Sequence, residues 1–139
     1  MSKLRVFLDT NVIFSALYNP NGLPAKLIYN SADLELMTSS YVMSELSKII
    51  SKRYPSLKLE LTKLCRITFL DAPDFSDDDL DLKSKDIPVL RAAQYFSCDY
   101  LVTGDLRDFK RFMSPNRSVL TRVVRVSDLI KIIKKPIST

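Results

Sequence analysis

Histidine and tryptophan are absent from this chain of 139 residues, and glycine and cysteine occur only twice each. Without histidine, Ser-His-Asp catalysis, Cys-His catalysis and imidazole-ligated metal sites are all excluded. The two glycines, Gly22 and Gly104, are too few for a Walker phosphate loop or a GxGxxG dinucleotide fingerprint. Any acid–base chemistry must therefore use carboxylates, lysine, tyrosine or metal-bound water.

The two cysteines, Cys65 and Cys98, form neither a CxxC pair nor a zinc-spaced cluster. Both lie in apolar patterns typical of helices. These surroundings favour buried structural thiols over a redox role.

Long apolar runs are also missing, since none approaches the roughly 18–20 residues that a membrane-spanning helix needs. Met1-Ser2-Lys3 leads directly into a predicted strand and leaves no room for a signal peptide, so we expect a cytoplasmic protein. The 46% of hydrophobic and 27% of charged residues are typical of a globular protein. The length suits one domain, spanning residues 1–139, around one core.

Positive charge is concentrated near the C-terminus. Residues 106–139 contain nine Lys and Arg but only two Asp, whereas the rest of the chain carries a slight acidic excess. A basic region beside an acidic core suits a polyanionic partner such as nucleic acid. A solvated basic surface that aids solubility explains the charge equally well. The cations nearest the acidic core that could contact nucleic acid are Arg107, Lys110 and Arg111.

Apolar patterns predict alternating strands and helices. Strands are expected at 4–8, 34–38, 67–70 and 100–103, with a last strand within 118–126. Helices are expected at 12–18, 24–31, 40–54, 86–96 and 106–112, with a final helix that ends at about 134, and a loop at 71–85. Ser39-Ser40 is the predicted N-cap of the helix at 40–54, and Ser127 is the predicted N-cap of the final helix. Residues 57–64 predict a helix, although alternation at 57–61 also allows a strand. The alternation predicts an α/β fold, a three-layer α/β/α sandwich around a mainly parallel sheet.

Two acids directly follow predicted strands. Asp9 ends the strand at 4–8, and Asp105 follows the strand at 100–103, offset by Gly104, whose flexible backbone allows a sharp turn. In a parallel sheet both ends lie at one edge, so the two acids would face one crevice if their strands are neighbours. Each acid could instead cap the helix that follows it.

Two further acids are predicted to reach the same edge. Glu45 lies one turn into the helix after Ser39, at the border of its apolar face. A solvated glutamate is the usual case on a helix, whereas a carboxylate at such a border near a strand end is less usual. Asp86 begins the helix before the strand at 100–103, and topology places that start beside Asp9 and Asp105. Capping this helix is compatible with a role in a site.

Four carboxylates in one crevice would repel one another and could not all stay ionised. Mg²⁺ or Mn²⁺ resolves this, because both cations prefer oxygen ligands. Such a metal lowers the pKa of its bound water and stabilises charge on a phosphoryl group, which suits phosphodiester hydrolysis. The acidic run at 77–81 is a weaker metal candidate, because it lacks the EF-hand spacing and its closing glutamate.

The ordered acidic motifs resemble those of the PIN-domain ribonucleases, and the resemblance covers essentially the whole chain. The motifs occur in the family's order and spacing and are Leu8-Asp9-Thr10-Asn11-Val12, Ser44-Glu45-Leu46, Asp86 with Leu90-Arg91-Ala92-Ala93, and Thr103-Gly104-Asp105-Leu106-Arg107-Asp108-Phe109.

This resemblance implies a Mg²⁺- or Mn²⁺-dependent endoribonuclease that cleaves single-stranded RNA. Its implied catalytic and metal-binding quartet consists of Asp9, Glu45, Asp86 and Asp105. Asn11 and Thr103 match polar positions that support the quartet, and Asp108 matches an additional acid of some members. Many small members are toxins of toxin–antitoxin pairs and form homodimers. The resemblance therefore implies an antitoxin partner and a homodimer for this chain.

Three other classes of function are alternatives for this sequence. A haloacid-dehalogenase-type phosphatase needs a second Asp two residues after the first, where this chain has Asn11. A receiver domain needs adjacent acids at the end of its first strand, which are absent. The serious alternative is a module of the same fold that binds RNA or protein with little or no catalysis, and the presence of all four acids argues against it.

Overall fold

A five-stranded, entirely parallel sheet forms the centre of the fold. The computed structural model describes residues 3–30, 32–62, 64, 67–72, 87–104 and 121–134. The strands lie in the order β3-β2-β1-β4-β5. Their bounds are β1 Leu4–Leu8, β2 Leu34–Ser39, β3 Ile67–Leu70, β4 Tyr100–Val102 and β5 Arg122–Val124. The predicted mainly parallel sheet is confirmed.

The central strand β1 has no exposed face along its second half. Val6, Phe7 and Leu8 are fully buried, which explains why the sequence here is a continuous apolar run rather than an alternating one. On one side Val6 pairs with Leu36 of β2, and on the other Leu8 pairs with Val102 of β4. The strands that precede Asp9 and Asp105 are therefore neighbours, which is the condition for the two acids to face one crevice.

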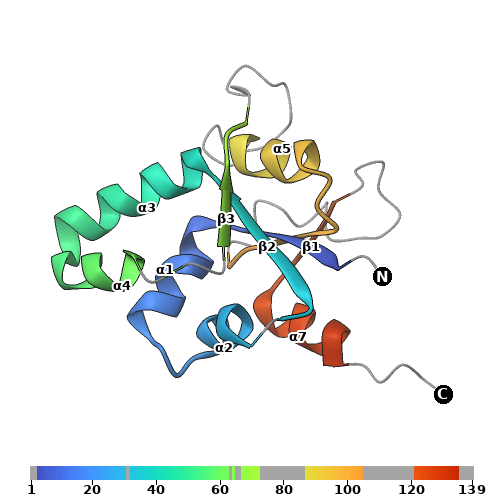
Figure 1. Cartoon of the computed structure of the whole chain (residues 1–139), viewed down its shortest axis with the longest axis horizontal. Helices are drawn as coiled ribbons and strands as arrows, with labels where there is room; N and C mark the ends of the chain where they lie inside the picture. The colour runs from blue at the N-terminus through green and yellow to red at the C-terminus, as the bar shows by residue number, and fades with distance from the viewer. Residues whose placement is uncertain are drawn as a thin grey trace.

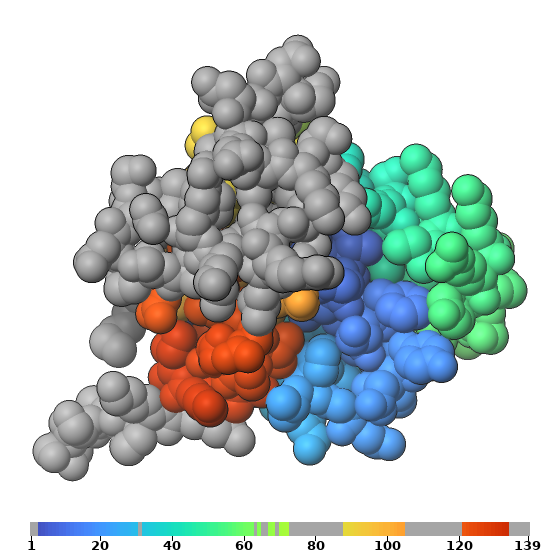
Figure 2. Space-filling view, turned by 180° about the vertical axis from the view of Figure 1, so that it is seen from behind, coloured from blue at the N-terminus to red at the C-terminus, as the bar shows by residue number. Residues whose placement is uncertain are grey.

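Helices cover both faces of the sheet (Figure 1). The chain moves one way along the sheet from β1 to β3 and then back across it to β4, so right-handed crossovers place the intervening helices on opposite faces. Figure 1 shows α5 on one side of the strands and α2 and α7 on the other. Figure 2 shows α7 beside α2 on one surface, in agreement with their contact. The helices are α1 Thr10–Tyr18, α2 Leu23–Tyr29, α3 Ser40–Arg53, α4 Lys58–Thr62, α5 Ile87–Tyr95 and α7 Val126–Lys134.

Local capping chemistry explains where several helices begin. The Ser39 hydroxyl accepts a hydrogen bond from the Val42 N–H (3.3 Å) and caps α3, as predicted. The final helix differs from its prediction, because it begins at Val126 and Ser127 already lies inside it. Asp128 caps it instead, since its Oδ2 accepts a hydrogen bond from the Arg125 N–H (3.3 Å).

Other expectations are resolved in part. Residues 57–61 form no strand, because the short 3₁₀ turn Pro55–Leu57 leads directly into helix α4. The predicted helix at 106–112 and most of the loop at 71–85 lie outside the described residues. Within the part of the chain that the structure describes, no helix is long and apolar enough to cross a membrane.

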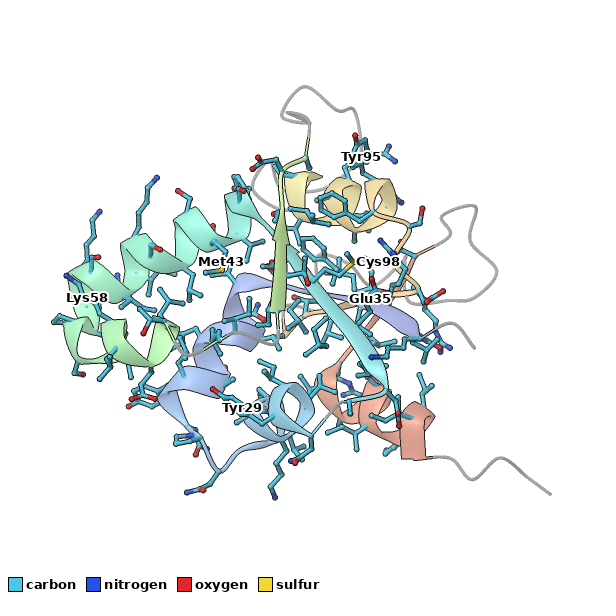
Figure 3. The ribbon with its side chains drawn as sticks, in the orientation of Figure 1. Tyr29, Glu35, Met43, Lys58, Tyr95 and Cys98 are labelled. Atoms are coloured by element: carbon cyan, nitrogen blue, oxygen red, sulfur yellow. The ribbon has the colours of Figure 1, made fainter. Side chains whose placement is uncertain are left out.

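Cys98 is a free, buried thiol, as predicted, but it does not belong to a helix (Figure 3). It lies in the connection between α5 and β4, after Ser97, whose φ of 56° ends the helical path. Its Sγ lies 3.5 Å from Sδ of Met37. Burial raises the pKa of this thiol to about 12, because the apolar core disfavours the thiolate. Cys65 lies outside the described residues.

We expect Cys98 to be chemically inert in the native protein. In a Cys65→Ser variant, a thiol-specific reagent at pH 8 should label Cys98 only after unfolding in urea, as followed by absorbance. The Cys98 thiol has a pKa of about 12 in the folded protein and about 9 in the unfolded chain, so between these pH values only the unfolded chain loses the thiol proton. Ionisation therefore favours the unfolded chain, and the contribution of Cys98 to stability should be lost as pH rises from about 9 towards 12. Rapid labelling of the folded protein would contradict this account.

Candidate active site

The site begins where β1 and β4 end side by side. Leu8 and Val102 are paired, and the N–H of Asp9, the next residue, donates to the carbonyl oxygen of Val102 (3.1 Å). Thr103 follows Val102, and its Oγ1 donates a hydrogen bond to Oδ2 of Asp9 (2.8 Å). Parallel pairing therefore delivers one carboxylate and one supporting hydroxyl to the same point of the sheet edge.

The Asp9 carboxylate is both a helix cap and a buried acid. Its Oδ1 accepts a hydrogen bond from the Thr10 N–H (2.7 Å) at the start of α1, and only 6% of the residue is exposed. A buried carboxylate requires donors of this kind, because desolvation otherwise disfavours its charge strongly. The capping role therefore coexists with a place in the site.

Glu45 reaches this edge from α3, which packs against α1. Its Oε1 accepts a hydrogen bond from Oγ1 of Thr10 (2.5 Å), and the residue is partly buried. Thr10 thus touches both carboxylates, through its backbone N–H at Asp9 and through its hydroxyl at Glu45. The structure brings these two predicted site residues together.

Thr10 is a residue that sequence reasoning missed as part of the site. The signal in the sequence was a threonine directly after the acid that ends a strand. Its hydroxyl can donate a hydrogen bond to a second carboxylate on a helix that packs against α1. The partner on α3 is 35 residues away, and only the packing of the two helices reveals it.

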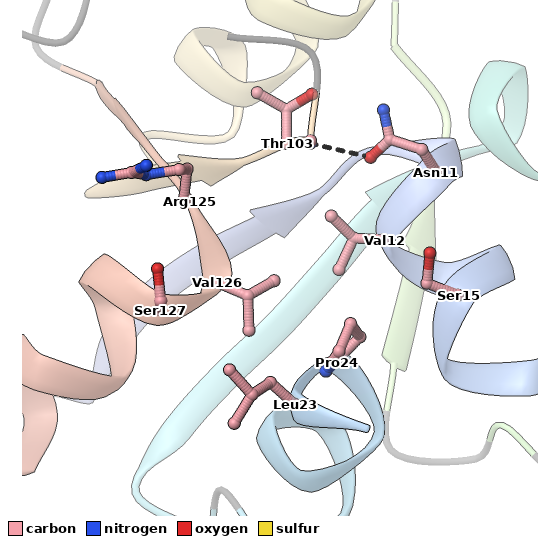
Figure 4. Close-up of a pocket in the computed structure, with 10 residues that line it drawn as sticks. Asn11, Val12, Ser15, Leu23, Pro24, Thr103, Arg125, Val126 and Ser127 are labelled. Carbon is pink, nitrogen blue, oxygen red and sulfur yellow. Dashed lines mark hydrogen bonds between the residues drawn. The ribbon is translucent and has the colours of Figure 1, made fainter. Parts of the chain in front are cut away.

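Asn11 and Gly104 connect the two strand ends a second time. The side-chain Oδ1 of Asn11 accepts a hydrogen bond from the Gly104 N–H (2.9 Å), as drawn in Figure 4. The chain bends at Gly104, as predicted, although this glycine does not adopt a positive φ. A Cβ there would lie 3.4 Å from Asn11 Oδ1, which is an ordinary van der Waals contact.

The other predicted site residues lie outside the described residues. They are Asp86, Asp105, Asp108, Arg107, Lys110 and Arg111. In the sequence, Asp86 directly precedes α5 and Asp105 directly follows Gly104. The described part of the site therefore consists of Asp9, Glu45, Asn11 and Thr103, with Thr10 added by the structure.

The described carboxylates suit a hard divalent cation. Asp9 and Glu45 supply only oxygen donors, the type that Mg²⁺ and Mn²⁺ prefer, and Thr10 and Thr103 hold their carboxylates in place. Among the described residues, no group of three or more His, Cys, Asp and Glu gathers closely enough to hold a metal. A complete site of this kind thus needs further ligands beyond Asp9 and Glu45.

Comparison with known proteins identifies the class. A model of the PIN domain matches residues 5–107, so the chain belongs to the PIN-domain family. No curated protein sequence matches it.

Several solved structures share its fold. VapBC2 from Rickettsia felis bound to a DNA fragment from its promoter is 20% identical, with a TM-score of 0.67, over 88% of this chain and 98% of that one. DNA-bound VapBC from Salmonella typhimurium is 18% identical, with a TM-score of 0.62, over 88% of this chain and 98% of that one. VapBC-1 from nontypeable Haemophilus influenzae is 17% identical, with a TM-score of 0.62, over 89% of this chain and 99% of that one. These likenesses confirm the α/β/α fold.

Removing the Thr103 hydroxyl should destabilise the protein through Asp9. Thr103→Val keeps the shape of the side chain but takes one donor from a buried carboxylate, which should lower the free energy of unfolding by about 1–3 kcal/mol. The matched control is Thr68→Val on β3, because Thr68 is exposed. Urea denaturation measures both, and equal midpoints for the two variants would contradict the role of Thr103.

Proposed function

We propose that this protein is a Mg²⁺- or Mn²⁺-dependent endoribonuclease that hydrolyses phosphodiester bonds of single-stranded RNA. The main support is the meeting of Asp9 and Glu45 through Thr10 at the carboxyl edge of a PIN-domain sheet. PIN domains are generally nucleases. The absence of histidine leaves oxygen-ligated metal chemistry as the natural route to hydrolysis.

In this proposal Asp9, Glu45, Asp86 and Asp105 hold the cation. When bound, the cation neutralises charge on the phosphoryl group and lowers the pKa of a water molecule. Thr103 and Thr10 keep the carboxylates of Asp9 and Glu45 oriented toward the cation site. One carboxylate accepts a proton as water attacks phosphorus and one P–O bond of the RNA backbone breaks.

The RNA strand is held by positive charge near the site. Arg107, Lys110 and Arg111 follow Asp105 closely in the sequence, and the net charge of the chain is +5. Among the described cations of the C-terminal part, Arg122, Arg125 and Lys131 are exposed. Contacts of this kind bind the phosphate backbone without reading sequence.

We also propose that the protein is the toxin of a toxin–antitoxin pair, that it binds an antitoxin protein and that it forms a homodimer. The support is its fold, which it shares with VapBC structures from three bacteria and with FitAB bound to an IR36 DNA fragment.

The nuclease proposal predicts cleavage that depends on Asp9. Wild-type protein with Mg²⁺ or Mn²⁺ should cut a labelled single-stranded RNA, whereas Asp9→Asn should fold but lose at least about 100-fold in rate, because its amide is a poorer ligand and carries no charge. Asp33→Asn is the matched control, since Asp33 is exposed in the turn before β2, and it should cut normally. Gel electrophoresis of the products measures the rates.

Two results would decide against this mechanism. Equal cleavage by wild type and Asp9→Asn would point to a contaminating nuclease. Retained RNA with no cleavage by either protein would favour the alternative of an RNA-binding module without catalysis.

RNA affinity should fall steeply with salt, because phosphate contacts release condensed counterions. Three such contacts predict a loss of roughly twentyfold in affinity between 50 and 200 mM salt, using a slope of about −0.7 per contact for single strands. Fluorescence anisotropy of a labelled oligoribonucleotide measures this dependence. An RNA affinity that does not change with salt would contradict phosphate binding by the basic region.

A further inference from the structure

A pocket of about 610 Å³ opens next to the candidate active site (Figure 4). This volume lies within the range of small-ligand sites in proteins, about 300–1,000 Å³. The described lining comes from α1, from the start of α2, from the end of β4 and from the start of α7. Four segments that are distant in sequence therefore contribute to one hollow.

The pocket and the candidate active site share residues. Asn11, Thr103 and Gly104 line the pocket, and Thr103 also holds the Asp9 carboxylate. Figure 4 shows Asn11 and Thr103 together at one end of the pocket, and Leu23 and Pro24 at the other. A polymer with its scissile phosphate at Asp9 would therefore place a neighbouring unit at or in this pocket.

The lining combines flat apolar surface with hydroxyl groups. Val12, Leu23, Pro24 and Val126 form the apolar part, and Leu23 remains 47% exposed. Ser15 and Ser127 lie on opposite sides of it in Figure 4. Apolar surface covers the face of an aromatic ring, and hydroxyls can donate to or accept from the polar edge of a base.

The described part of the lining favours a neutral group over a phosphate. The Arg125 guanidinium pairs with Asp128, with Nε 3.1 Å from Oδ2, and its side chain points away from Ser15 and Pro24 (Figure 4). Apart from Arg125, the described lining residues are apolar or uncharged polar groups.

We propose that this pocket binds one unstacked nucleobase of single-stranded RNA, adjacent to the phosphodiester bond that is cut. The inference rests on the proposed function and adds to it the part of the substrate that the protein reads. Single-stranded bases can leave the stack and enter such pockets, whereas the bases of a duplex must first be unpaired and unstacked. Continuity with the Asp9 site favours the substrate over a partner protein as the occupant.

RNA binding by variants of the full chain tests the pocket apart from catalysis. In an Asp9→Asn background, which prevents cutting, Ser15→Leu fills the pocket and Leu23→Ala removes part of its wall. The matched controls are Ser51→Leu on α3 and Leu59→Ala on α4, since both residues are exposed outside the pocket. Anisotropy measures Kd for one labelled oligoribonucleotide, single-stranded and as a duplex with its complement.

We expect the two pocket variants to raise Kd for the single strand by about tenfold, as loss of one bound base does. The duplex Kd should stay unchanged, as should both values for the controls. The base-pocket proposal would be wrong if the pocket variants changed Kd equally for single strand and duplex, or if their Kd values matched those of the controls. The nuclease proposal would be unaffected by either result. If wild type and Asp9→Asn bind no RNA at all, the pocket and the RNA substrate fail together.

Discussion

The burial of a carboxylate at the end of the central strand constrains the rest of this structure. Asp9 is 6% exposed, so its charge must be matched by donors. One donor is the first residue of α1, and another is the residue after β4. Pairing of β1 with β4, the start of α1 and the position of Thr103 are therefore required together. A shift in any of them would weaken or remove one of these hydrogen bonds to the Asp9 carboxylate.

Thr10 extends this constraint to a second acid. Its hydroxyl holds Glu45, so the packing of α3 on α1 sets where the second carboxylate lies relative to the first. Two carboxylates that share one neighbour repel each other when both are ionised. A divalent cation would relieve that repulsion, and the pocket beside Asn11 and Thr103 offers space for the substrate next to it.

The sequence predicted the architecture well, because buried parallel strands leave a strong local signal. The run 4–8 was assigned correctly as a strand, and Asp9 follows it directly. Helix boundaries depend on single caps, and α7 was misplaced because Asp128 rather than Ser127 caps it. The apolar pattern around Cys98 is typical of a helix, but this residue follows the helix, because the pattern does not reveal the left-handed residue Ser97 before it. The neighbourhood of β1 and β4, the Thr10–Glu45 contact and the pocket arise from long-range packing, which local patterns do not encode. The roles of Asp86, Asp105 and Asp108 stay predictions.

Direct measurement of metal binding tests the central claim, that Asp9 and Glu45 share one divalent cation. Isothermal titration of the full chain with Mn²⁺ alone, in the absence of RNA, should show binding by wild type. Asp9→Asn and Glu45→Gln should each weaken it by at least about tenfold, since metal binding here needs both charges. Glu35→Gln should bind normally, because Glu35 pairs with Arg5 on the strands before the carboxyl edge. Equal Mn²⁺ affinity in all four proteins, or no binding by wild type, would contradict the claim.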